Sequence, residues 1–315
     1  MKPSQLSDAC QCSKACQCIK EVLNHGNMEF VEAIRREQQL LETTNSENDS
    51  EKSRLPETGY IKQLGRLGET LQQSPKTVVL ACSDARVPVL DLFQRRANEV
   101  FEIQLEGNVA STECLGSISY AVEHLPKIEG IVVLGHTGCG AITAAVDQYL
   151  SPQLEATTVE GSIMSLIRTI IPSVDIAASV LAMNSPSTQG TVLRDALDRR
   201  KLIGTATFVN AAAMAWKVQA FVRGLRRNIP VWYGVYDLAS CRILHADLDR
   251  RDGSLLFGLG DAPHVTELNE VAQILVMYLQ KMNHFDAAKF STNGHNLQTT
   301  AAWEKLSMGD TASAT

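Results

Sequence analysis

The sequence predicts an α/β fold with a mainly parallel central sheet of four strands flanked by helices. Two apolar runs, residues 77–81 and 131–134, have the length and the β-branched content of fully buried parallel strands. Each run is followed closely by a short segment that contains cysteine or histidine. Because ligands bind at the carboxyl ends of the strands in an open α/β sheet, the two segments should meet in one crevice.

The N-terminal region is expected to form a Cys-rich tail over residues 1–18, followed by a helical segment. Apolar residues recur at helical spacing over 19–36, with a break at His25-Gly26-Asn27. The stretch 37–57 is polar enough to be a flexible insertion, and 60–72 is expected to be a short helix. The tail carries four closely spaced cysteines: Cys10, Cys12, Cys16 and Cys18. They could bind a soft metal, form redox-linked pairs or be acylated, and the alternative is that the tail is simply an exposed end of the chain.

The rest of the chain alternates between strand and helix patterns. Two further strands are expected at 100–104 and 231–238, and helices are expected at 112–124, 141–149, 160–181 and 206–227. The helix expected at 141–149 stops at Ser151-Pro152, because proline does not continue a helix. We expect one domain over 19–260, and a C-terminal helix with a mobile tail over 261–315.

Composition narrows the class of protein. A net charge of −6 and an isoelectric point near 5.7 carry no signature of nucleic acid binding. The chain has no run of 18 consecutive apolar residues, which predicts no membrane span. The first residues resemble neither a secretory signal nor a transit peptide, which predicts a cytoplasmic location. In a reducing compartment, the eight cysteines are expected to be thiols or metal ligands.

Metal-binding side chains follow the two apolar runs. Cys82 begins the segment Cys82-Ser83-Asp84-Ala85-Arg86, and His136 and Cys139 lie in Gly135-His136-Thr137-Gly138-Cys139-Gly140. A lone cysteine is most often a small buried hydrophobic residue. Two thiolates and one imidazole at one sheet edge, however, form a tetrahedral zinc site with one position left for water. The sequence therefore predicts a catalytic zinc site.

These motifs resemble the β-class carbonic anhydrases, and the resemblance covers residues 20 to 240. It implies one Zn²⁺ per subunit, held by Cys82, His136 and Cys139. It also implies an N-terminal helical arm and an antiparallel edge strand at 242–246. The substrate pocket would be of the plant type, with four residues at matching positions: Gln73, Phe101, Tyr120 and Gly140.

The resemblance implies reversible hydration of carbon dioxide to bicarbonate and a proton, through attack by zinc-bound hydroxide. Asp84 would either orient the hydroxide or become a fourth zinc ligand, and Arg86 would hold the Asp84 carboxylate through charge-assisted hydrogen bonds. The partners implied are a small-molecule substrate and further copies of the chain, in a homodimer or a higher even-numbered oligomer.

Two alternatives remain open on the sequence. The same ligands would serve hydrolysis of carbon disulfide or carbonyl sulfide, or the protein would be a noncatalytic scaffold that retains the zinc. The scaffold alternative is based on one departure from the family pattern. The family often has Arg-Asn before a Gly-Asn pair, where this chain has Gln104-Leu105-Glu106 before Gly107-Asn108.

Overall fold

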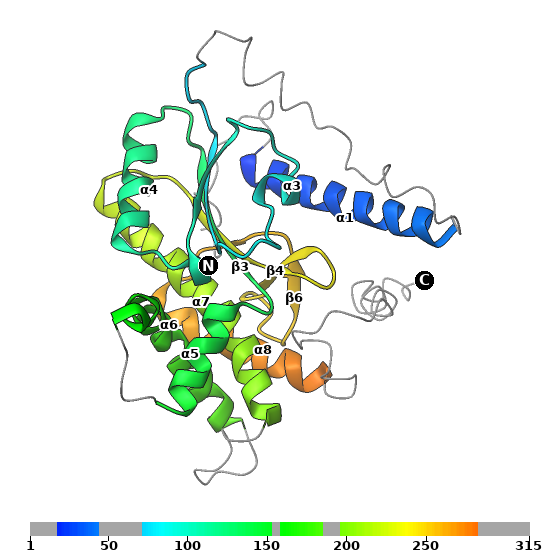
Figure 1. Cartoon of the computed structure of the whole chain (residues 1–315), viewed down its shortest axis with the longest axis vertical. Coiled ribbons are helices and arrows are strands. Elements are labelled where there is room, and N and C mark those ends of the chain that lie inside the picture. The colour runs from blue at the N-terminus through cyan, green and yellow to red at the C-terminus, as the bar shows by residue number, and fades with distance from the viewer. Residues whose placement is uncertain (1–17, 44–70, 153–157, 185–195, 283–315) are drawn as a thin grey trace, which may run out of the picture.

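The computed structural model describes residues 18–43, 71–152, 158–184 and 196–282 (Figure 1). Several expected features lie outside these residues. They are most of the Cys-rich tail, the greater part of the expected insertion, nearly all of the expected helix at 60–72 and the expected C-terminal tail after residue 282. The division into tail, domain and C-terminal segment stays a prediction.

A seven-stranded sheet forms the centre of the fold, and its hydrogen-bonded order is β2-β1-β3-β4-β5-β6. The strands are β1 (Thr77–Ala81), β2 (Val100–Gln104), β3 (Gly130–His136), β4 (Val231–Asp237), β5 (Arg242–Ala246), β6 (Leu255–Phe257) and β7 (Gly260–Asp261). The first four pair in parallel, and β5 pairs antiparallel with β4. This confirms the expected mainly parallel sheet. It also extends it, because β6 pairs outside β5 and β7 pairs with β4.

The register of the strands fixes where the sheet ends. Ala81 of β1 lies beside Gln104 of β2 on one side and beside Leu134 of β3 on the other. The residues that follow Ala81 therefore emerge next to the end of β3. This arrangement places the two cysteine- and histidine-containing segments at the same edge of the sheet, as the sequence predicted.

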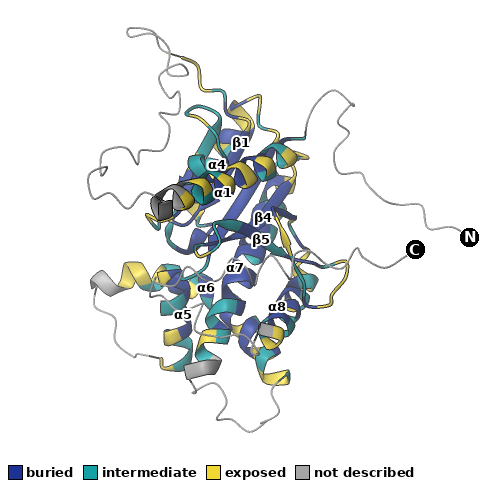
Figure 2. Cartoon of the chain, turned by 90° about the vertical axis from the view of Figure 1, so that its right-hand side faces the viewer, coloured by how far each residue is buried: buried dark blue, intermediate teal, exposed yellow. Residues whose placement is uncertain are grey.

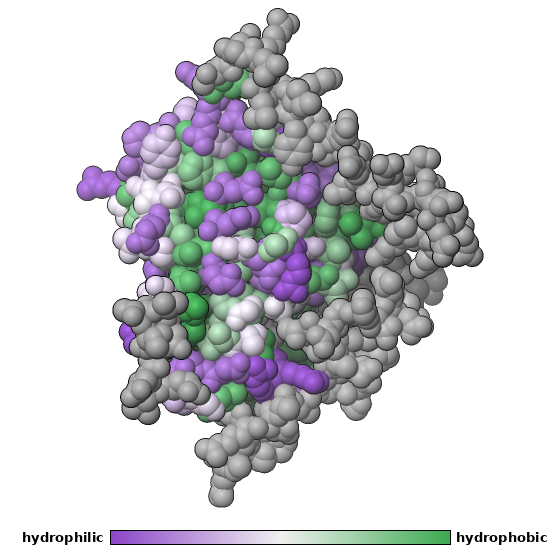
Figure 3. Space-filling model, viewed as in Figure 1, coloured by the Kyte–Doolittle hydropathy of each residue, from purple (hydrophilic) through white to green (hydrophobic). Residues whose placement is uncertain are grey.

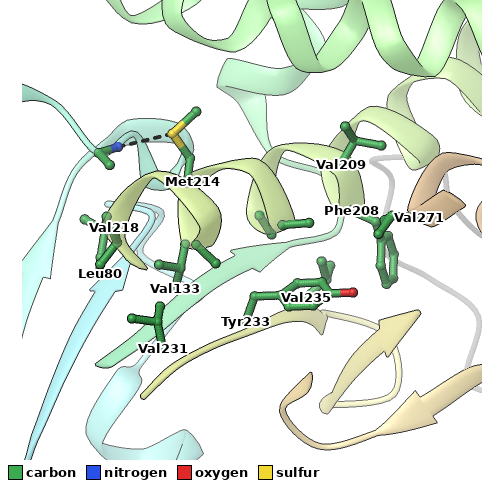
Figure 4. Close-up of a cluster of buried hydrophobic side chains, with 14 of the residues drawn as sticks. Leu80, Val133, Phe208, Val209, Met214, Val218, Val231, Tyr233, Val235 and Val271 are labelled. Carbon is green, nitrogen blue, oxygen red and sulfur yellow. Dashed lines mark hydrogen bonds between the residues drawn. The ribbon is translucent and has the colours of Figure 1, made fainter. Parts of the chain in front are cut away.

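Helices cover both faces of the sheet, because alternate strand residues point to opposite sides. On one face, Leu80, Val133 and Tyr233 belong to a cluster with α7 (Ala196–Gly224) and α8 (Leu268–Met282), as Figure 4 shows. The α4 helix (Thr112–His124) contributes Cys114, Ile118, Ala121 and Val122 to the same cluster. Figure 3 shows hydrophilic and hydrophobic residues interspersed on the described part of one molecular surface.

On the opposite face, α1 (Ile19–Thr43) and α3 (Val89–Leu92) pack against the alternate residues of the strands (Figures 1 and 2). The expected break at His25-Gly26-Asn27 is wrong, because α1 is continuous. A Cβ on Gly26 would clash with the carbonyl oxygen of Phe93, so glycine is needed there for close packing. Asn27 docks the helix by donating to the carbonyl oxygens of Leu92 and Cys241.

Two more helices, α5 (Gly140–Leu150) and α6 (Thr158–Met183), pack together beside α7. Part of α6, Gly161–Met183, is the one segment among the described residues that is long and apolar enough to cross a membrane. It has one buried side, with Ile170 and Val174 in a cluster shared with α5 and α7, while Arg168 and Asp175 are exposed. This amphipathic pattern is that of a helix packed on a protein core. The α7 helix begins ten residues before the expected start at residue 206.

Candidate metal centre

Three buried side chains from three places in the fold converge at the carboxyl edge of the sheet. Cys82 follows β1 directly, His136 is the last residue of β3, and Cys139 is the N-cap of α5. The two sulfur atoms lie 3.9 Å apart, and all three potential ligand atoms lie within 4.8 Å of one another. The structure therefore brings together the three residues that the sequence predicted as ligands.

The orientation of the His136 ring fits a metal. Its Nδ1 lies 3.0 Å from the carbonyl oxygen of Thr137, so Nδ1 donates the proton and Nε2 keeps a free lone pair. Among the described residues, Nε2 is fully buried without a hydrogen-bond partner. Leaving a buried polar atom unpaired costs free energy, and a cation bound between this nitrogen and the two sulfurs would remove that cost. The donor set of one nitrogen and two sulfurs suits Zn²⁺.

A second layer of hydrogen bonds fixes the turn after His136. The Thr137 hydroxyl donates to Asp237 Oδ1 at 3.1 Å and accepts from the Leu238 backbone at 3.0 Å. Asp237 is buried, and its other oxygen accepts from the Ser240 hydroxyl at 2.6 Å. These bonds hold the Thr137 peptide, and so they hold the carbonyl oxygen that sets the tautomer of His136.

The contact between the two thiols shifts their pKa values in opposite directions. The Cys139 thiol contact, together with His136 and the backbone amides of Asp84 and Gly107, lowers the pKa of Cys82 to about 4 against the opposing effect of burial. The neighbouring Cys82 sulfur and burial raise the pKa of Cys139. Cys82 is therefore the thiol that ionises first, and bound Zn²⁺ would compensate the cost of the second thiolate.

Asp84 and Arg86 form a bidentate ion pair beside the ligands. Arg86 Nε donates to Asp84 Oδ1 at 2.9 Å, and an Arg86 terminal nitrogen donates to Oδ2 at 2.7 Å. The Arg86 side-chain hydrogen bonds are the largest cause that lowers the pKa of Asp84 to about 2. Asp84 Oδ2 lies 3.8 Å from His136 Nε2. The carboxylate is therefore ionised and close to the ligands, and it would have to leave Arg86 to become a ligand itself.

Glu106 is a site residue that sequence reasoning did not single out. Burial, followed by the charges of Cys82 and Asp84, raises the pKa of its carboxyl group. Its Oε1 lies 3.9 Å from the position that a Cβ on Gly140 would occupy, so this carboxyl group borders the start of α5. The departure from the family pattern at Gln104-Leu105-Glu106 was the available signal.

The expected pocket residues divide into two groups. Gly140 begins α5 directly after Cys139 and so belongs to the metal centre. Phe101 pairs with Val78 near the amino end of the strands, and Gln73 lies four residues before β1, whereas the metal ligands lie at the carboxyl end. Tyr120 is 49% exposed, and its ring centroid lies 6.4 Å from that of Phe101. Within one chain, the structure does not bring Gln73, Phe101 and Tyr120 to the metal ligands, and their role as a pocket stays a prediction.

A family model and individual relatives of this chain belong to the same protein family. Residues 77–233 match the family model described as carbonic anhydrase. The chain is 37% identical over 109 residues to a carbonic anhydrase of Mycolicibacterium smegmatis, which covers 35% of this chain and 50% of that protein. It is 33% identical over 179 residues to a carbonic anhydrase of Pseudomonas aeruginosa, and this match covers 55% of this chain and 73% of that protein.

The chain thus spans about half the length of the first curated relatives that it matches. Among solved structures, a β-carbonic anhydrase of Aspergillus fumigatus is 17% identical, with a TM-score of 0.43 over 81% of this chain and 97% of that chain.

Proposed function

The chain belongs to the β-carbonic anhydrase family, and on this premise we propose that it catalyses the zinc-dependent, reversible hydration of carbon dioxide to bicarbonate and a proton. One observation carries the proposal. Cys82, His136 and Cys139 lie with their ligand atoms within 4.8 Å of one another, and the buried Nε2 of His136 has no other partner among the described residues. An ionised aspartate lies beside them.

The three ligands would hold the zinc ion, whose Lewis acidity makes hydroxide available at neutral pH for attack on carbon dioxide. Asp84 would accept a hydrogen bond from the attacking oxygen and so direct a lone pair toward the substrate carbon. Arg86 keeps Asp84 ionised and restrains its carboxylate in one orientation through two parallel hydrogen bonds. Because Arg86 also lies 3.4 Å from the Gly138 carbonyl oxygen, it links the two loops that bear the ligands.

The apolar part of the substrate pocket would come from a second copy of the chain. Phe101 and Tyr120 lie close together, and Tyr120 exposes about half of its surface although it is a large aromatic residue. Packing this surface against the metal-bearing edge of another copy would bring Gln73 and both rings to a substrate. The proposal therefore includes a homodimer or a higher even-numbered oligomer. It also includes a cytoplasmic location.

The test is stopped-flow hydration of carbon dioxide by purified protein of measured zinc content, with Asp84→Asn as the variant and Cys139→Ser as the metal-free control. The wild-type protein should turn over, Asp84→Asn should keep its zinc and lose at least tenfold in rate, and Cys139→Ser should lose both. A zinc-loaded wild-type protein that does not hydrate carbon dioxide would contradict the proposal. Turnover of carbon disulfide or carbonyl sulfide by that same sample would then support the alternative substrates.

A further inference from the structure

A tight turn outside the ligand motifs contacts one of the zinc ligands. The backbone N–H of Gly107 donates to Cys82 Sγ at 3.3 Å. Gly107 has a φ of 67° and Asn108 a φ of 48°, so two consecutive residues adopt the left-handed conformation. Glycine and asparagine adopt this conformation readily, so the turn is not strained, but the freedom of glycine means that contacts from elsewhere in the fold must fix its orientation.

That support comes from α7, 103 residues along the chain. Asn210 Nδ2 donates to the carbonyl oxygen of Gly107 at 2.9 Å. Its Oδ1 accepts from the Ser173 hydroxyl of α6 at 3.4 Å. Asn210 is completely buried, between Val209 and Ala211 of the apolar cluster on the sheet. Burying an amide is unfavourable unless it is hydrogen-bonded, so an apolar residue would be expected here if only packing mattered.

We propose that Asn210 is a positioning residue for the zinc thiolate Cys82, and that it acts by clamping Gly107 so that the Gly107 N–H points at the sulfur. The clamp acts on the carbonyl group of Gly107 and the metal-ligand contact on its N–H group, which belong to the two successive peptide planes that meet at its Cα. Because glycine rotates freely about both bonds of its Cα, fixing one plane restricts the orientation of the other. The inference rests on the proposed zinc site, but it does not depend on which substrate that site uses.

The expected consequence is a change in the metal-sulfur bond. A hydrogen bond to a coordinating thiolate withdraws charge from the sulfur and fixes its orientation, and loss of such outer partners typically costs about 10- to 100-fold in metal affinity. Asn210→Asp keeps the size of the side chain and the acceptor for Ser173, but its ionised carboxylate has no donor for Gly107. Asn210→Leu removes both bonds at similar volume. Both variants should therefore weaken zinc binding.

The experiment measures zinc affinity by chelator competition and the sulfur-to-metal charge-transfer band of the cobalt(II)-substituted protein. The matched control is Thr205→Val, on the same helix, because the Thr205 hydroxyl is buried without a partner among the described residues. Asn210→Asp and Asn210→Leu should raise the zinc dissociation constant about 10-fold or more and shift the band. Thr205→Val should change neither, since it does not contact Gly107.

A zinc dissociation constant within twofold of wild type and an unshifted band in both Asn210 variants would overturn the inference. If neither variant folds, Asn210→Ser becomes the deciding variant, because its side chain is too short to reach the Gly107 carbonyl oxygen. An unshifted band in that variant would also overturn the inference. A wild-type protein that binds no zinc would instead contradict the zinc site itself, so the two failures are distinguishable.

Discussion

Replacing Gly107 by alanine should destabilise the protein by about 2 to 5 kcal/mol. At a φ of 67°, the left-handed conformation costs an alanine about 1 to 2 kcal/mol. Its Cβ would also lie 2.8 Å from Ile170 Cδ1 and 3.1 Å from Ala141 Cβ. Ile170 is completely buried and has little room to move, so overpacking adds about 1 to 3 kcal/mol.

The assay is urea unfolding in the presence of a zinc chelator at matched protein concentration, so that neither metal binding nor oligomerisation contributes differently to the two samples. Gly204→Ala is the matched control. Gly204 lies inside α7, and a Cβ there would meet Leu279 Cδ1 at 3.7 Å, an ordinary contact. That variant should be stabilised by up to about 1 kcal/mol, because alanine favours the helix. A free energy of unfolding of Gly107→Ala within about 0.5 kcal/mol of wild type would refute this reasoning. A Gly107→Ala protein that is at least as stable as Gly204→Ala would also refute it.

Zinc content by elemental analysis should fall well below one per subunit in each ligand variant: Cys82→Ser, His136→Ala and Cys139→Ser. Arg86→Gln should lower the free energy of unfolding by about 1 kcal/mol at pH 7, a value reduced for the half-exposed Arg86. The folded pKa of Asp84 is depressed to about 2, so the difference in free energy of unfolding between Arg86→Gln and wild type should persist above pH 4 and vanish as the pH falls through 2. A difference in free energy of unfolding that is unchanged at pH 2 would contradict the ion-pair explanation. Sedimentation of Tyr120→Asp should give a smaller species than wild type, whereas an unchanged mass would argue against an interface at Tyr120.

The sequence by itself determined the candidate metal ligands and the class of sheet. Cys82 and His136 each stand at the end of a buried parallel strand, and the ends of neighbouring parallel strands meet at one edge. Cys139 follows His136 by one tight turn. Strand periodicity, the chemistry of the side chains and the geometry common to parallel sheets are enough to place these residues together.

Only the tertiary structure decided which residues support those ligands. Nothing local links Asn210 to Gly107, because 103 residues separate them and the contact depends on how α7 lies over the sheet. The sequence also does not show that α1 continues through Gly26, because glycine is ordinarily unfavourable in a helix. The close approach of the Phe93 backbone is what requires a glycine at this position. Local propensity is worth about 1 kcal/mol per residue, and packing contacts between distant segments outweigh it.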